Sequence, residues 1–181
     1  MRRSSKIYTL TMTAAAAAIL GVIGPWTIPV GPVPLSLCTL LLYLVPWILD
    51  WKGAVAAALV YLAMGAAGLP VFAGFMGGLG HLAGPTGGYI IGYVFLTAVC
   101  ALSLQRIPGR WAYPAGMLMG TAILYAMGTA WFCVQTGRGA GEAMVLCVVP
   151  FLPGDLVKML AAFALGPVLR SRLERTGLLK A

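Results

Sequence analysis

Charged side chains are scarce in this sequence, and their scarcity excludes most soluble folds. Only 9% of the 181 residues are Asp, Glu, Lys or Arg, whereas 61% are apolar. A soluble domain of this length keeps roughly a quarter of its residues charged. Because too little polar surface remains to cover a globule in water, we expect the surface of this protein to face lipid.

Catalytic and metal-binding motifs are also missing. The chain has four carboxylates, one histidine (His81) and no asparagine, and it contains no GxxxxGK[ST], HExxH or GxSxG motif. Its cysteines stand singly in or beside apolar runs, at Cys38, Cys100, Cys133 and Cys147. We interpret them as small packing residues and expect no metal site and no cofactor. Without a P-loop the chain cannot hydrolyse ATP by that route, and we do not expect it to be an enzyme.

Hydropathy predicts an all-α membrane protein with six transmembrane helices in one domain covering residues 1–181. The apolar segments are 7–27, 36–50, 53–69, 86–105, 112–135 and 145–169. If the N-terminus is cytoplasmic, the outer connections contain a single basic residue, Arg138, and Lys158 lies inside the last span. The inner segments then hold Arg2, Arg3, Lys6, Lys52, Arg106, Arg110, Arg170, Arg172, Arg175 and Lys180. This sorting predicts that both termini are cytoplasmic, and it favours membrane ends over a nucleic-acid surface.

Two charges in the last predicted span are the sharpest functional signal. Asp155 and Lys158, in the run Pro153-Gly154-Asp155-Leu156-Val157-Lys158, are three residues apart and therefore share one helical face. A charge at the middle of a membrane helix costs about 2.5–3.5 kcal/mol by insertion scales, so these two need a reason to be there. One interpretation is a structural pair that neutralises itself. The other is a binding site in which Lys158 offers a cation to an anionic solute and Asp155 holds the lysine or accepts hydrogen bonds from the solute.

Small residues mark three further segments. The glycine-rich stretch 65–92 contains enough apolar side chains to favour a folded loop that caps an outer pocket over a flexible linker. Within it, Thr86 can cap a helix, Gly87 and Gly88 allow close approach of backbones, and Tyr89 is either an interfacial aromatic or a ligand contact. The alanine run from Ala14 to Ala18 favours close helix packing, either inside the protein or with a membrane partner.

Taken in order, these motifs resemble the BioY family, the biotin-binding S components of energy-coupling factor (ECF) transporters. The resemblance rests on the segments Pro32-Val33-Pro34, Gly68-Leu69-Pro70-Val71-Phe72-Ala73-Gly74, Gly84-Pro85-Thr86-Gly87-Gly88-Tyr89 and Leu152-Pro153-Gly154-Asp155-Leu156-Val157-Lys158. It implies a prokaryotic, multi-pass protein of the plasma membrane that captures biotin from outside. It also implies docking onto a transmembrane coupling subunit driven by two ATPase subunits, through Ala14 and Ala18 of the first helix.

The same resemblance assigns contacts to biotin. Lys158 would pair with the biotin carboxylate, and Asp155 matches the neighbouring aspartate of the family. If a side-chain amide contacts the ureido ring, Gln135 is the only candidate on the outer side, since Gln105 lies at an inner helix end. Otherwise the contact would come from Thr86, Tyr89, Ser36 or the backbone of the glycine loop, including Gly87 and Gly88. The alternatives are an S component for another small anionic vitamin, and a membrane scaffold or enzyme.

Overall fold

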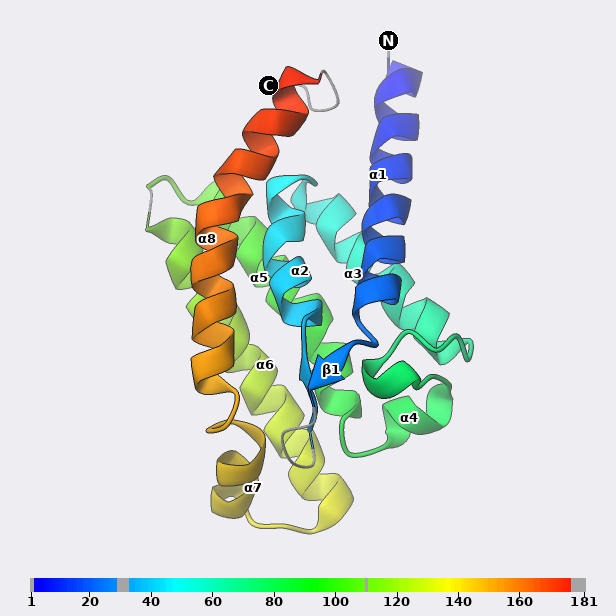
Figure 1. Cartoon of the computed structure of the whole chain (residues 1–181), viewed down its shortest axis with the longest axis vertical. Helices are drawn as coiled ribbons and strands as arrows, with labels where there is room; N and C mark the ends of the chain where they lie inside the picture. Colours follow the sequence, from blue (N-terminus) through cyan, green and yellow to red (C-terminus); the bar gives the residue numbers. More distant parts are fainter. Residues whose placement is uncertain (1, 29–32, 110, 177–181) are drawn as a thin grey trace.

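The computed structural model of the chain describes residues 2–28, 33–109 and 111–176, and these residues form an elongated helical bundle (Figure 1). The helices are α1 (Arg2–Ile23), α2 (Cys38–Leu44), η1 (Val45–Trp47), α3 (Trp51–Ala66), η2 (Ala73–Phe75), α4 (Leu79–Ala83), α5 (Gly87–Arg106), α6 (Ala112–Thr136), α7 (Ala140–Cys147) and α8 (Leu152–Arg175). Two short strands, β1 (Thr27–Ile28) and β2 (Leu35–Ser36), pair antiparallel between α1 and α2. The predicted helical class is confirmed, whereas the strand pair was not foreseen.

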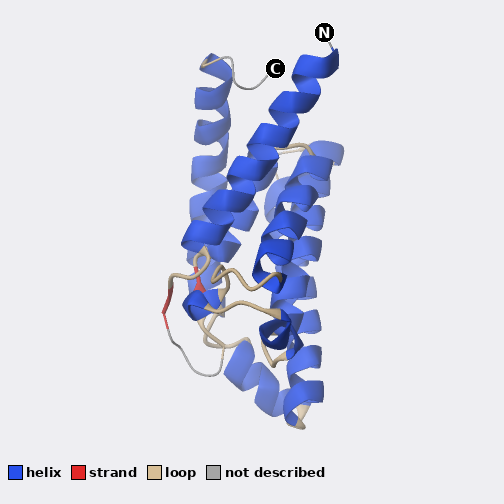
Figure 2. Cartoon of the chain, turned by 90° about the vertical axis from the view of Figure 1, so that its right-hand side faces the viewer, coloured by secondary structure: helices blue, strands red, loops and turns tan. Residues whose placement is uncertain are grey.

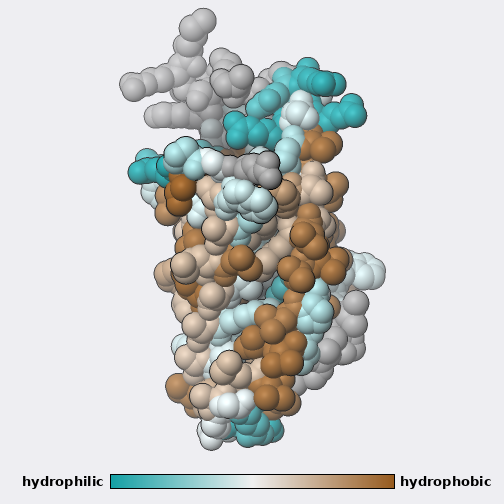
Figure 3. Space-filling view, turned by 90° about the vertical axis from the view of Figure 1, so that its left-hand side faces the viewer, coloured by the Kyte–Doolittle hydropathy of each residue, from teal (hydrophilic) through white to brown (hydrophobic). Residues whose placement is uncertain are grey.

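The bundle has the length and surface of a membrane protein. Among the described residues, α5, α6 and α8 are long and apolar enough to cross a membrane, and shorter apolar helical segments cover 7–23, 38–47 and 51–66. Apolar side chains cover the middle of one face, whereas hydrophilic ones gather at its two ends (Figure 3). The chain is therefore a multi-pass membrane protein. The start of α1 and the end of α8 lie at the same end of the bundle (Figures 1 and 2).

Prolines account for the main differences from the predicted spans. The short second span breaks near Pro46, where α2 gives way to the 3-10 turn η1, because proline cannot donate the backbone hydrogen bond that continues an α-helix. The predicted last span, 145–169, is wrong at both ends. The chain turns at 148–151 between α7 and α8, and Pro153 is tolerated in the first turn of α8, which continues to Arg175.

Glycines bring α5 and α6 into close contact at the end of the bundle opposite the termini. A Cβ atom at Gly128 of α6 would lie 2.3 Å from the ring of Tyr89, and one at Gly88 of α5 would lie 2.3 Å from Cβ of Trp131. Only a residue without a side chain fits at either position. This packing fixes Tyr89 between α5 and α6, where it faces the interior.

The alanine run of α1 divides between two surfaces. Ala17 is buried in a cluster that includes Ala54 and Ala57 of α3. Ala14 and Ala18 are exposed. Packing within the protein therefore accounts for Ala17 and for the partly buried Ala16, which packs against the same cluster, but not for Ala14 and Ala18.

Candidate ligand-binding site

A small cavity lies where β2, α2, α5, α6, α7 and α8 converge, toward the end of the bundle away from the termini. Its volume is about 40 Å³. It is lined by Val33, Pro34, Leu35, Ser36, Thr39, Tyr89, Tyr93, Leu124, Tyr125, Cys147, Phe151, Asp155 and Lys158. The lining thus combines aliphatic and aromatic side chains with a few polar groups, as is typical of small-molecule sites.

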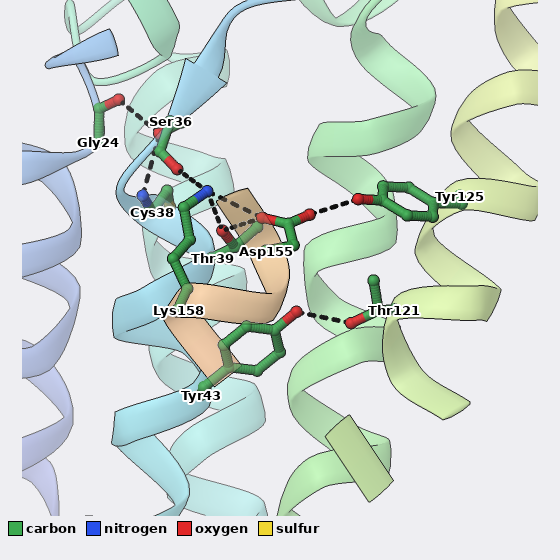
Figure 4. A network of polar contacts seen from close by, with 9 residues as sticks. All are labelled: Gly24, Ser36, Cys38, Thr39, Tyr43, Thr121, Tyr125, Asp155 and Lys158. Carbon is green, nitrogen blue, oxygen red and sulfur yellow. Dashed lines mark hydrogen bonds and ion pairs between the residues drawn. The ribbon is translucent and has the colours of Figure 1, made fainter. Parts of the chain in front are cut away.

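A buried ion pair forms the polar wall of this cavity. Nζ of Lys158 donates to Oδ1 of Asp155 at 2.8 Å, and both residues belong to the first two turns of α8 (Figure 4). Lys158 is 7% exposed and Asp155 is 5% exposed. The two charges compensate each other, and Asp155 also benefits from the positive end of the helix dipole in the first turn of α8.

The remaining hydrogens of the Lys158 ammonium are held by the segment that joins α1 to α2. Nζ donates to the backbone carbonyl of Ser36 at 2.7 Å and to Oγ1 of Thr39 at 3.0 Å. The Ser36 hydroxyl in turn donates to the carbonyl of Gly24, at the end of α1, and accepts from the backbone N–H of Cys38. Lys158 therefore links α8 to β2 and α2, and through Ser36 to the end of α1.

The second oxygen of Asp155 faces α6. The Tyr125 hydroxyl donates to Oδ2 at 2.5 Å, while Thr39 donates to Oδ1 at 3.4 Å (Figure 4). Both oxygens of the buried carboxylate therefore have hydrogen-bond donors, and Oδ1 also has the ammonium partner. The cluster consequently presents fixed donors and acceptors to anything that enters the cavity.

Tyr89 lines the cavity, and its hydroxyl group already has partners within the protein. The hydroxyl group is within hydrogen-bond distance of Oγ1 of Thr129, at 3.0 Å, and it donates to the carbonyl of Cys147 at 3.4 Å. Tyr93, four residues further along α5, lies on the same helical face and also lines the cavity. The two rings form an apolar wall on α5.

The structure brings together three of the seven residues predicted to contact a ligand. Lys158, Asp155 and Tyr89 line the cavity, and Ser36, named as an alternative contact, joins them. Thr39 and Tyr125 also line the cavity but were missed. No spacing rule connects them to Lys158, because they come from helices far apart in the sequence.

The other four predicted contacts lie elsewhere. Thr86 lies 3.4 Å from His81, and a Cβ atom at Gly87 would overlap the carbonyl of Leu82, so both belong to the packing of α4 against α5. Gly88 packs against Trp131, as described above. Gln135 is exposed near the end of α6 and does not line the cavity. The glycine-rich segment is folded, as predicted, but 65–88 contributes no lining residue.

No group of His, Cys, Asp and Glu side chains gathers as metal ligands would within the ranges that the structure describes. Cys38, Cys100 and Cys147 are buried and Cys133 is partly buried, all as free thiols. They pack between helices, in agreement with their predicted role.

Comparisons with known proteins agree with this geometry. The sequence profile of the BioY family matches residues 1–175. The "Biotin transporter BioY2" of Lactococcus lactis is 32% identical over 96% of this chain and 96% of its own length, and the "Biotin transporter BioY" of Thermotoga maritima is 38% identical over 78% of this chain and 83% of its own. The crystal structure of an S-component for biotin from an ECF-type ABC transporter superposes with a TM-score of 0.85 at 27% identity, covering 94% of this chain and 95% of that one. The chain belongs to the BioY family.

Proposed function

We propose that this protein is the biotin-binding S component of an ECF-type ABC transporter. The observation that carries the proposal is the buried Lys158–Asp155 pair at the wall of an aromatic-lined cavity, in a chain that matches a biotin S-component over nearly its whole length. Biotin has an anionic tail, an apolar thiophane ring and a polar ureido head. The cavity offers a cation, three tyrosine side chains and several hydroxyl groups to these three parts.

In the membrane, the chain forms one substrate-binding domain with six crossings and with both termini in the cytoplasm of a prokaryotic cell. The crossings are α1, α2 with η1, α3, α5, α6 and α8. This arrangement is supported by the common end at which α1 begins and α8 ends, and by the concentration of basic residues there. The cavity then opens toward the outer face, where a nutrient arrives.

The Lys158 ammonium is the partner of the biotin carboxylate in this proposal. Its three hydrogens already have protein acceptors, namely Asp155, Ser36 and Thr39. A ligand carboxylate must therefore replace one of them, and Ser36 and Thr39 are the neutral ones. Replacement of the Ser36 carbonyl would free β2 from α8, so that capture of the ligand and movement of the α1–α2 segment would occur together.

The size of the cavity also requires part of its lining to move when biotin binds. A volume of about 40 Å³ holds a few water molecules but not a bicyclic ligand with a five-carbon tail. Binding must therefore displace part of the lining. The segment 33–36 and α7 (Ala140–Cys147) are short, whereas α5, α6 and α8 are helices of 20 or more residues. We assign the movement to the former.

Transport would require partners that this chain does not contain. The sequence has no P-loop, and we propose that a coupling subunit and two ATPase subunits provide these functions; the structural neighbour, an S-component from an ECF-type ABC transporter, supports this. The exposed pair Ala14 and Ala18 on α1 is the proposed contact with the coupling subunit, since a stripe of small side chains allows another helix to approach closely.

Isothermal titration of the purified protein tests the proposal. Biotin should bind, whereas pantothenate, an anionic vitamin of different shape, should not. Binding of pantothenate in preference to biotin would favour an S component for another small anion. Absence of binding by either would contradict the assignment.

A further inference from the structure

The connection between α3 and α5, residues 67–86, is unusual for a segment outside the membrane-spanning helices. Between Lys52 and Arg106 the chain has no Asp, Glu, Lys or Arg, and His81 is the only titratable group of the connection. By contrast, the connection between α6 and α7 contains Arg138, which pairs with Glu142. A surface that stands in water is expected to contain charged groups at roughly the soluble average of one residue in four.

Large apolar side chains of this connection are exposed instead. Leu79 is 70% exposed, Phe75 is 56% exposed, and Leu69 and Met76 are exposed to a similar extent. Trp26, which follows α1, is 63% exposed and contacts Phe75 edge to face, with ring centroids 5.8 Å apart. A contiguous apolar patch of this kind marks a surface that is covered by something other than water.

The backbone conformation of Phe75 also indicates that the patch has a role. Phe75 has a φ of 61°, in the left-handed region that bulky residues rarely adopt. The strained conformation is maintained although the side chain is not packed in the core. What it achieves is to place the aromatic ring beside Trp26 on the outside of the protein.

Many backbone N–H and C=O groups of this irregular connection form hydrogen bonds within the protein. The carbonyl of Gly65 accepts from the N–H groups of Gly68 and Gly78, at 3.0 and 2.7 Å, and the N–H of Phe72 donates to Met76 at 2.9 Å. Two side chains from neighbouring helices complete the pattern: the Tyr61 hydroxyl donates to the carbonyl of Val71, and the Trp131 indole N–H to that of Gly84. Such internal pairing is what non-helical backbone needs at membrane depth, where water is not available as a partner.

The histidine does not add a charge to the patch at neutral pH. The His81 ring stacks on Phe72, with centroids 5.8 Å apart, and lies 3.4 Å from the Thr86 hydroxyl. Partial burial lowers the pKa of His81 below its ordinary value of 6.5. The neutral form therefore predominates at pH 7.

We propose that residues 67–86, together with Trp26, form an apolar cap seated in the lipid interface at the cavity end of the bundle, between the headgroups and the acyl chains. The occupant of the patch is phospholipid, since the neighbouring helices also expose apolar side chains, among them Val22 of α1 and Leu59 of α3, and since residues 67–86 include no Asp, Glu, Lys or Arg that would pair with a charged protein partner. Aromatic residues with one apolar and one polar side are typical of this depth. The cap goes beyond ligand capture, and it does not depend on the identity of the ligand.

Nitroxide labels at single cysteines test the cap in phosphatidylcholine vesicles. The labelled variants are Met76→Cys and Leu79→Cys in a full-length chain whose four native cysteines are replaced by alanine. Gly139→Cys, in the charged connection, is the matched label for water, and Leu118→Cys, exposed on α6, is the matched label for lipid. With a nickel chelate on both sides of the membrane, labels at 76 and 79 should lose collisions with the chelate and gain collisions with oxygen, approaching the behaviour of the label at 118. Labels at 76 and 79 that behave like the label at 139 would overturn the proposal.

Trp26 provides a second measurement that needs no cysteine substitution. The fluorescence lost on Trp26→Phe isolates the emission of Trp26 from that of the other tryptophans. Lipids brominated near the carbonyl end of the acyl chain should quench this emission, and aqueous iodide should not. Quenching by iodide alone would place the patch in water, and quenching by neither would place it against another protein chain; both results contradict the cap.

Discussion

The Tyr125 hydroxyl of α6 donates to Oδ2 of Asp155 at 2.5 Å, on the side of the carboxylate opposite the Lys158 ammonium (Figure 4). Asp155 thus joins α6 to α8, while Lys158 joins α8 to the α1–α2 segment. A buried carboxylate held from both sides is expensive to disturb, because the loss of either donor leaves part of its charge without compensation. The pair is therefore a structural junction as well as the cationic wall of the cavity.

Replacement of the lysine tests its role as carboxylate partner. We expect Lys158→Ala to weaken biotin binding by about 2–4 kcal/mol, because a largely desolvated charge pair is broken. Biotin amide, which lacks the carboxylate, should lose most of its affinity for the unmodified protein and be nearly indifferent to the substitution. Arg170→Ala, which removes an exposed cation from the same helix, is the control and should leave titration curves unchanged. Equal binding of the acid and the amide would show that Lys158 is not the carboxylate partner.

A double variant separates binding from neutralisation. In Asp155→Asn with Lys158→Met, neither position is charged. The unfolding temperature of this variant in detergent should therefore be closer to that of the unmodified protein than the unfolding temperature of Lys158→Ala is. Biotin affinity should stay low, since the cation is still missing. Recovery of affinity along with stability would mean that the pair serves only to neutralise itself.

The tyrosine that the sequence did not single out has its own test. Tyr125→Phe keeps the ring and removes the donor to Oδ2 of Asp155, so we expect the free energy of unfolding to fall by about 1–3 kcal/mol. Tyr89→Phe, at the same cavity, removes a hydrogen bond between uncharged groups and should cost about 0.5–1.5 kcal/mol. Denaturant unfolding in detergent compares the two. A smaller effect at 125 than at 89 would contradict the assigned role of the carboxylate.

The sequence indicated the charged part of the site most clearly, because those residues conflict with their surroundings. Asp155 and Lys158 are visible because two charges in an apolar helix demand an explanation. Thr39 and Tyr125 do not conflict with theirs, since a hydroxyl is common in membrane helices, and only the fold brings them to the carboxylate. Spacing along the chain contains no information about such distant partners.

Glycines are harder to interpret. Gly87 and Gly88 were predicted to approach a ligand, and in this structure they lie against Leu82 and Trp131. A missing side chain indicates that something lies close without indicating what. Gln135 was named because it is the only side-chain amide expected on the outer side, and it is exposed near the end of α6. The end of a helix was predicted well where a charged residue follows the apolar run, as at Arg106, where α5 ends. It was predicted poorly at 145–152, because the apolar run continues through the turn between α7 and α8.

The glycine at the base of the cap gives a prediction about stability. A Cβ atom at Gly65 would lie 2.0 Å from the fully buried ring of Phe72, so Gly65→Ala should lower the free energy of unfolding by about 1–3 kcal/mol through overpacking. Gly80 in α4 has no atom within 4 Å of the same position, and Gly80→Ala should be neutral or slightly stabilising. Unfolding of the two variants in detergent makes the comparison. Equal effects would mean that the cap does not pack as described.

The proposed orientation can be read from the accessibility of two connections. In intact cells, a membrane-impermeant maleimide should label Gly139→Cys and should reach Pro108→Cys only after permeabilisation, since 108 lies between Arg106 and Arg110 at the inner ends of α5 and α6. Both variants need a chain without the native cysteines. Labelling at 108 from outside would overturn the six-crossing arrangement with cytoplasmic termini.

Ala14 and Ala18 should separate transport from binding. They lie four residues apart on the exposed side of α1, whereas Ala17 faces α3, and the cavity is formed by other helices. A stripe that faces only lipid gains nothing from small side chains, because lipid accommodates larger ones; a stripe that receives a helix needs them for close approach and weak Cα–H···O contacts. Ala14→Trp or Ala18→Trp should therefore leave the biotin affinity of the isolated protein within about threefold, or roughly 0.7 kcal/mol, while abolishing ATP-dependent uptake and co-purification with a coupling subunit.

Two further variants of α1 are the controls for this prediction. Ile19→Trp, exposed on another side of the same helix, should leave binding and uptake intact, whereas Ala17→Trp should impair both by disrupting the core. Titration of the purified variants and uptake by cells that supply the ATPase subunits form the paired measurement. Loss of binding in Ala14→Trp would assign the stripe to the protein's own packing, and unchanged uptake would mean that it faces lipid alone.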